Sequence, residues 1–220
     1  MKSNPVSTTW SPELAYITGL MASDGNLSND GRHMVFVSKD VQLIRTFKKC
    51  LGIKTKVSLK KSGFAPDKKY YFVQFGDIRL YNFFLSIGIT PAKSKTIGVL
   101  KIPDKYFFDF LRGSFDGDGS FYSYWDKRWA SSFLFYLSFM SVSLDHIVWL
   151  RKKIKELTRS SGHAGKETYG GRAYQLKYAK TEARIILSKI YYSAHIPKLE
   201  RKYKKVYSAL AIDNRHARVL

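Results

Sequence analysis

The stretch that decides the fold is Leu-Arg-Gly-Ser-Phe-Asp-Gly-Asp-Gly at residues 111–119, and a related stretch, Ile-Thr-Gly-Leu-Met-Ala-Ser-Asp-Gly, occupies residues 17–25. Each is expected to form a helix that carries two small residues four positions apart: Gly19 with Ser23, and Gly113 with Gly117. Small residues at this spacing leave a flat stripe on which two helix backbones can pack closely. The sequence therefore predicts that these two helices pack against each other.

Each of the two helices is followed by an acid, Asp24 in the first and Asp118 in the second. The C-terminal end of a helix is already negative, so a carboxylate there costs stability unless a cation offsets it. Two carboxylates at neighbouring helix ends offer the oxygen ligands that Mg²⁺ prefers. A single Asp-Gly is usually only a turn. Its recurrence at the same place in both stretches favours a functional role.

Outward from these helices, the same series of elements occurs twice. A helix opens at Ser11-Pro12, where Ser is a preferred cap and Pro suits the first helical position. The elements expected after it are strands at 26–28 and 33–38, a helix at 41–51, strands at 56–62 and 69–75, and a helix at 77–87. The second series comprises a helix at 105–115, strands at 120–126 and 133–142, a helix at 145–158, strands flanking Tyr169-Gly170-Gly171, a helix at 181–192 and a basic helix after Pro197.

Three anchors relate the two series in the same order. Asp24-Gly25 returns after 94 residues, the Val-Ser-x-Asp of 37–40 returns after 105, and Pro91 returns after 106. An internal repeat of this kind indicates two tandem copies of one structural unit. We predict an α+β protein of two αββαββα units, residues 1–100 and 101–220, joined near residues 90–103.

Composition narrows the partner. The 220 residues include 38 Lys and Arg against 17 Asp and Glu, a net charge of +21 that self-repels unless a polyanion binds. Basic residues are spread along the chain, which favours nucleic acid over a membrane surface. A lone cysteine, Cys50, excludes an internal disulfide and a cysteine-built zinc site. Without an apolar span or a signal-peptide core, we expect an intracellular protein, cytoplasmic or organellar, neither secreted nor bound to a membrane.

The two stretches resemble the paired motifs of LAGLIDADG homing endonucleases, in the single-chain form that carries both, and the resemblance covers essentially the whole chain. It implies two pseudo-symmetric halves, each with a curved antiparallel sheet, which form a saddle over DNA. It also implies that Asp24 and Asp118 bind the catalytic Mg²⁺, assisted by the main-chain carbonyls of Ser23 and Gly117. Mn²⁺ or Ca²⁺ can substitute for binding.

One departure from the family pattern affects the first motif. Ala22 stands where the second motif has its earlier acid, Asp116. That acid is normally structural in the family, so catalysis is not put in doubt, although the two halves are free to contribute unequally.

The activity implied by the resemblance is a metal-dependent double-strand break in a long asymmetric DNA target, leaving 3′ overhangs, made by an intron-encoded monomer. Basic residues expected near the cleaved phosphates are Lys93 or Lys95, Arg201 or Lys202, and Lys39. Strand residues expected to reach base edges are Lys56, Ser58, Lys60, Gln175 and Lys177, and flanking phosphates would meet Lys198, Lys204 and Lys205. Plain solvation is an equally good interpretation of any one of these side chains.

Three other functions fit part of the pattern. An RNA-binding group I intron maturase could use the same scaffold with intron RNA as its partner, and a DNA-binding regulator could carry a degenerate motif. Both motif acids are present, which favours cleavage. A PD-(D/E)xK nuclease is suggested by Pro66-Asp67 and Glu200-Arg201-Lys202, but it leaves the repeat unexplained. The many Tyr and Phe residues allow base stacking, although core packing is the simpler interpretation.

Overall fold

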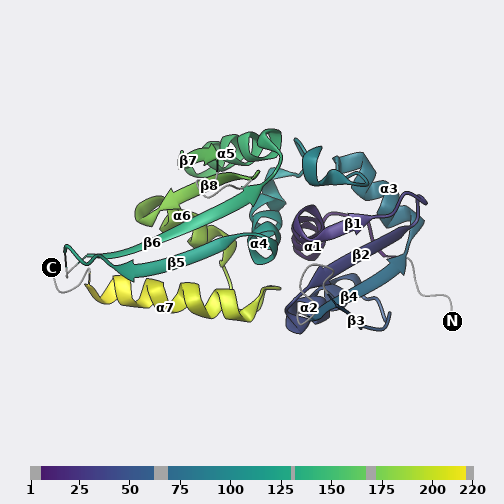
Figure 1. Ribbon diagram of the computed structural model, residues 1–220, viewed down its shortest axis with the longest axis horizontal. Coiled ribbons are helices and arrows are strands. Elements are labelled where there is room, and N and C mark those ends of the chain that lie inside the picture. Colours follow the sequence, from purple (N-terminus) through teal and green to yellow (C-terminus); the bar gives the residue numbers. More distant parts are fainter. Residues whose placement is uncertain (1–5, 62–68, 130–131, 167–171, 217–220) are drawn as a thin grey trace. The chain divides into compact units, whose positions relative to one another are not determined.

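The structure is a computed structural model that describes residues 6–61, 69–129, 132–166 and 172–216. The chain divides into two compact units, Met1–Gly117 and Asp118–Leu220. Each unit contains one four-stranded antiparallel sheet with helices packed on it (Figure 1). The predicted α+β class and the repeated αββαββα order are confirmed.

The first unit contains the sheet β1-β2-β4-β3, in that order. Its helix α1 begins where expected, because Ser11 Oγ accepts a hydrogen bond of 3.1 Å from the Leu14 N–H. Helix α2 ends at Gly52, whose φ of 66° suits a residue without a Cβ. The elements are α1 Pro12–Ser23, β1 Gly25–Leu27, β2 His33–Ser38, α2 Val41–Leu51, β3 Ser58–Lys61, β4 Lys69–Gly76, α3 Ile78–Ile87, the short 3-10 helices η1 Lys93–Lys95 and η2 Asp104–Tyr106, and α4 Phe107–Gly117.

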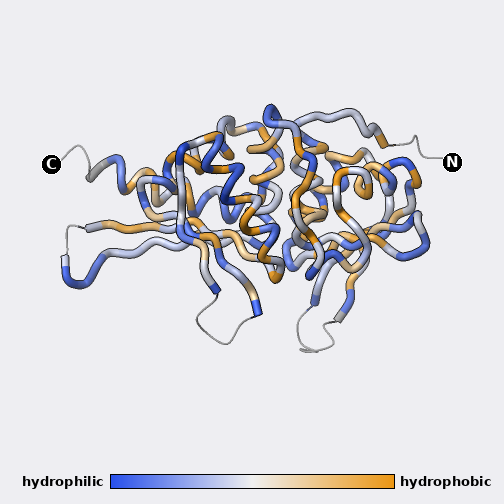
Figure 2. Tube along the Cα trace, turned by 90° about the horizontal axis from the view of Figure 1, so that it is seen from above, coloured by the Kyte–Doolittle hydropathy of each residue, from blue (hydrophilic) through white to orange (hydrophobic). Residues whose placement is uncertain are grey.

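The second unit repeats this plan with the sheet β5-β6-β8-β7. Figure 2 colours the turn after β5 hydrophilic and β6 largely hydrophobic, as expected for a core strand that leads out of a solvent-exposed turn. The elements are β5 Ser120–Trp125, β6 Phe133–Ser141, α5 Leu144–Thr158, β7 His163–Lys166, β8 Tyr174–Ala179, α6 Lys180–Ile190 and α7 Glu200–His216. Helix α7 lies against β5 (Figure 1).

The compact units and the sequence repeat divide the chain at different places. Helix α4 falls in the first unit because it packs along α1, whereas the repeat assigns residues 107–117 to the second half. Compactness follows contacts and the repeat follows chain order, so the repeat boundary between residues 100 and 101 stays a prediction.

Each sheet has a buried face and a face that we call its open face. In the second sheet, Phe121, Phe135 and Leu137 point to the buried face and form part of the core. The antiparallel register places the alternate residues Tyr122, Tyr124, Tyr136 and Lys177 on the open face. In the first sheet the open face carries Val35, Val37, Phe72, Gln74 and Lys60.

An ionic cluster around Asp213 fastens α7 to α6 within the second unit. Asp213 is 3% exposed, and its Oδ1 lies 2.6 Å from the Lys180 Nζ. Its Oδ2 accepts a hydrogen bond from Arg184, which also donates to Asn214 Oδ1 at 2.6 Å. The carboxylate is thus buried between two cations, and both pairs disappear if it is removed.

We expect Asp213→Ala to lower the free energy of unfolding by about 1–3 kcal/mol, because two charge-assisted contacts are lost while the partly exposed cations rehydrate. Denaturant unfolding followed by circular dichroism measures the change. Asn214→Ala, which removes only one exposed acceptor of Arg184, is the matched control and should cost under about 0.5 kcal/mol. Equal stability of the two variants would contradict the latch.

Two sequence predictions fall outside the described residues: the Tyr169-Gly170-Gly171 turn and the Pro66-Asp67 dipeptide. Elsewhere the element boundaries differ by a few residues; the helix predicted at 105–115, for example, begins with the η2 turn and runs on to Gly117. Within the described ranges, no helix combines the length and the apolar character needed to cross a membrane.

Candidate functional site

The site begins with the packing of α1 on α4. A Cβ added to Gly19 would lie 2.1 Å from the Phe110 carbonyl oxygen, and one added to Gly113 would lie 2.0 Å from the Tyr16 carbonyl oxygen. Both distances are far below van der Waals contact, so the two backbones touch directly at these glycines. The predicted packing of the two helices through their small residues is confirmed.

A buried polar cluster lies along the same helix pair and was not anticipated from the sequence. The guanidinium of Arg112 is fully buried, lies 2.7 Å from Asp109 Oδ1 and sits over the ring of Tyr16. The Tyr16 hydroxyl donates to Asp116 Oδ2 at 2.8 Å. Burial, reinforced by the negative charge of Asp116, raises the pKa of Tyr16 well above its usual value, so the hydroxyl stays a donor. These bonds fix the register of α1 against α4.

The first motif acid caps α1. Asp24 is half-buried, follows the last helical residue and donates its N–H to the Leu20 carbonyl at 3.0 Å. A Cβ on Gly117 would lie 3.5 Å from Asp24 Oδ2 and only 2.0 Å from Ser23 Oγ. The glycine at the end of α4 therefore allows the close approach of α4 to the Asp24 carboxylate.

Lys93 comes from the η1 turn to the same place. Its side chain is 5% exposed, and its Nζ donates to the carbonyl oxygens of Ser23 at 3.2 Å and Gly25 at 2.6 Å. These carbonyls flank Asp24 on both sides. Lys95, the other candidate in this turn, is exposed. Of the two lysines, Lys93 is the one that the fold brings beside the acid.

In the second unit a lysine reaches the carbonyl next to the other acid. Asp118 is exposed and directly precedes Gly119, whose carbonyl accepts a hydrogen bond of 2.6 Å from Lys202 Nζ. One turn further along α7, Lys205 donates to the Phe121 carbonyl at 2.8 Å. Arg201, the alternative to Lys202, is exposed. Each unit thus places an ammonium group on the main chain beside its motif acid.

The donor atoms at Asp24 fit a hard cation. A carboxylate and the Ser23 carbonyl stand together at a negative helix end, and the hydrogen bonds from Lys93 show that this carbonyl attracts positive charge. Within the described part of the chain, no three His, Cys, Asp or Glu side chains gather into a group that could hold a metal ion. A metal centre here would therefore depend on one acid from each motif together with main-chain oxygens.

The strand residues expected to contact bases fall on the open faces with one exception. Ser58 and Lys60 alternate on β3 and share a face, as do Gln175 and Lys177 on β8. Lys56 precedes the first residue of β3 and so lies outside the strand.

The remaining basic candidates differ in their surroundings. Lys39 is exposed, with its Nζ 5.5 Å from the ring centroid of Tyr70. Lys204 is exposed. Lys198 is only 7% exposed; its Nζ donates to the Ala194 carbonyl at 2.5 Å and lies 3.3 Å from Glu200 Oε1. Its ammonium group serves the loop before α7 in this structure, in contrast to the solvent-facing position expected of a phosphate contact.

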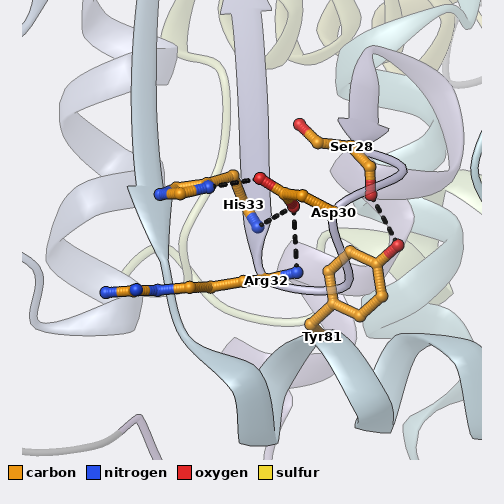
Figure 3. Close-up of polar contacts among 5 residues, drawn as sticks. All are labelled: Ser28, Asp30, Arg32, His33 and Tyr81. Carbon is orange, nitrogen blue, oxygen red and sulfur yellow. Dashed lines mark hydrogen bonds and ion pairs between the residues drawn. The ribbon is translucent and has the colours of Figure 1, made fainter.

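The β1–β2 turn presents two further basic side chains. Asp30 Oδ1 accepts hydrogen bonds from the main-chain N–H groups of Arg32 and His33, and its Oδ2 lies 2.5 Å from His33 Nδ1 (Figure 3). These bonds, led by that from the His33 N–H, lower the pKa of Asp30 to about 2. Tyr81 anchors the turn by donating to the Ser28 carbonyl at 2.6 Å. The turn therefore holds Arg32 and His33 in place at one end of the first sheet.

Comparison with solved structures identifies the fold. The structure of I-DmoI in complex with DNA and Mn matches 84% of this chain and 98% of that chain, with a TM-score of 0.53 and 17% identity. The homing endonuclease I-WcaI bound to its DNA recognition sequence matches 86% and 83%, with a TM-score of 0.60 and 10% identity. The N-terminal LAGLIDADG domain of DUF199/WhiA matches 87% and 88%, with a TM-score of 0.55 and 17% identity.

At these identities the likeness shows the fold, and for the fold the predicted resemblance to LAGLIDADG homing endonucleases is confirmed. No model of a known protein family matches the sequence, and no curated protein matches it.

Proposed function

We propose that this protein is a site-specific endonuclease that makes a metal-dependent double-strand break in a long asymmetric DNA target and leaves 3′ overhangs. The observation that carries the proposal is the arrangement at the motif acids: each stands at the end of a closely packed helix, with a lysine on an adjacent main-chain carbonyl. Because the same fold occurs in the DUF199/WhiA domain, the proposal rests on these residues rather than on the fold.

The motif acids and their lysines divide the chemistry between them. Asp24 and Asp118 would hold Mg²⁺, assisted by the carbonyls of Ser23 and Gly117. Bound there, the metal would supply an activated water and stabilise charge on the phosphate. Lys93 and Lys202 would neutralise charge that develops as a phosphodiester bond breaks. One acid and one lysine per unit match the two strands that must be cut.

The rest of the surface would hold double-stranded DNA. The net charge of +21 supplies the phosphate contacts, and the polar residues of the two open faces, among them Lys60, Gln175 and Lys177, would contact base edges in the major groove. The two units differ in sequence, so a monomer would read an asymmetric target. If about ten phosphates are neutralised, affinity should fall by roughly 10⁵ between 50 and 200 mM salt.

We expect Lys93→Met to slow cleavage by about 10²–10³-fold, because it removes a fixed positive charge beside Asp24 while keeping a side chain of similar length. Single-turnover cleavage of a supercoiled plasmid measures the effect and separates nicking from double-strand cutting. Lys95→Met, in the same turn but exposed, is the matched control and should retain most of the activity. Equal rates for the two variants would remove Lys93 from the mechanism.

The test of the proposed function is the selection of cleaved duplexes from a randomised DNA library, with Mg²⁺ in one arm and Ca²⁺ in the other. We expect one long sequence to be cut in Mg²⁺, with 3′ overhangs, and bound but left uncut in Ca²⁺. Tight binding to structured intron RNA without any cut duplex would overturn the proposal in favour of a maturase.

A further inference from the structure

Three tyrosines stand side by side on the open face of the second sheet. We call Tyr122, Tyr124 and Tyr136 the tyrosine patch. The ring centroids of Tyr122 and Tyr136 are 5.1 Å apart, with an angle of 22° between the rings. Tyr124 lies 6.4 Å from Tyr122 at 8° and 6.3 Å from Tyr136 at 14°. The three rings are therefore nearly parallel and form one aromatic surface.

This aromatic surface is open to solvent and positively charged. Tyr122 is 37% exposed and Tyr124 is 43% exposed. Lys177 Nζ lies 4.1 Å from the ring centroid of Tyr136 and 5.2 Å from that of Tyr122. Beyond the patch, the turn that follows β5 carries the exposed side chains of Lys127 and Arg128. Aromatic faces interleaved with cations are suited to bases joined by phosphates.

Core packing does not account for the patch. The same two strands already fill the core from their other face, through Phe121, Phe135 and Leu137. The corresponding strand of the first sheet, β1, is only three residues long and has no aromatic side chain. The patch is thus a feature of the second unit alone, on a face where the fold itself does not require aromatic residues.

We propose that the open face of the second sheet binds unpaired nucleotides of a single-stranded nucleic acid, with the tyrosine patch stacking on bases and Lys177 contacting the backbone phosphates. In a duplex the faces of the bases are covered by their neighbours, so aromatic rings have little to stack on. Unpaired bases offer these faces freely. The proposal is independent of the motif acids and of DNA cleavage.

The test measures binding by fluorescence anisotropy, in EDTA so that nothing is cut. The probes are oligo(dT) and oligo(rU) of about 12 nucleotides, an abasic oligonucleotide of the same length, and a duplex of the same length. The wild-type protein should bind oligo(dT) or oligo(rU) more tightly than the abasic strand, which keeps the phosphates but has no bases. The dT and rU arms show whether the face prefers DNA or RNA.

The double variant Tyr122→Ala/Tyr124→Ala should weaken binding to the single strand by about fivefold to 150-fold for each stacked base that is lost. Its affinity for the abasic strand and for the duplex should stay within about twofold. Tyr122→Phe/Tyr124→Phe keeps the rings and should bind like the wild type. Tyr207→Ala removes an exposed tyrosine of α7 and should also change nothing. Circular dichroism checks that each variant is folded.

Two outcomes would overturn the proposal. The first is unchanged single-strand affinity in the folded alanine variant. The second is an equal loss for duplex and single strand, which would mean that the patch contacts paired DNA. Because neither motif acid is altered, failure here would leave the proposed cleavage activity intact.

Discussion

Asp24→Asn and Asp118→Asn should each reduce DNA cleavage by at least about 10²–10³-fold while leaving DNA affinity within about twofold. Asparagine keeps the size of the side chain and one oxygen, but it removes the negative charge that a hard cation requires. Asp24 is half-buried at the end of α1, where its charge is disfavoured by the helix. Its replacement should therefore not destabilise the fold, and a small gain in stability is expected.

The experiment uses the target found by library selection. Cleavage is followed under single-turnover conditions with both strands labelled, and binding is measured separately in Ca²⁺. If each acid serves one strand, a variant with residual activity should nick the strand served by the intact acid. Asp30→Asn, an exposed acid in the β1–β2 turn, is the matched control and should cut normally. Full double-strand cutting by either motif variant would overturn the assignment of these acids.

The sequence was enough to predict nearly all of the secondary structure, and the physical reasons are local. Ser11 caps α1 through its own side chain, and Gly52 ends α2 in a conformation that glycine favours. The Gly and Ser spacing predicted the contact between α1 and α4, because a backbone contact of this kind tolerates only the smallest residues. Such features depend on neighbours along the chain, so they can be recognised in one sequence.

The site was only partly predictable, because its remaining parts depend on long-range packing. The sequence offered Lys93 and Lys95 as equals, and only the η1 turn, about 70 residues after Asp24, orients one of them inward. The buried pair Arg112 and Asp109 gave a weak signal, a charged residue among small and apolar ones within the second motif, that was not interpreted. The tyrosine patch emerged from strand register, which places residues of two strands on one face.

Gly113→Ala should lower the free energy of unfolding by about 3 kcal/mol or more, the largest effect on stability that we predict. Alanine is the better helix former by about 1 kcal/mol, so helix propensity alone predicts a gain. The new Cβ would, however, lie 2.0 Å from the Tyr16 carbonyl oxygen and 3.0 Å from both Gly19 Cα and Leu20 N. All three are main-chain atoms that cannot rotate away, so α1 and α4 must separate.

Denaturant unfolding of three variants tests this. Ser114→Ala, at the next residue, is the matched control, because the buried Ser114 hydroxyl has no hydrogen-bond partner among the described residues and its removal should be neutral or stabilising. Gly117→Ala should fall between the two, because its clash at 2.0 Å is with Ser23 Oγ, a side-chain atom that can move. Wild-type stability in Gly113→Ala would show that the backbones do not touch there. The expected order ties stability to function, since separating α1 from α4 would also displace α4 from Asp24.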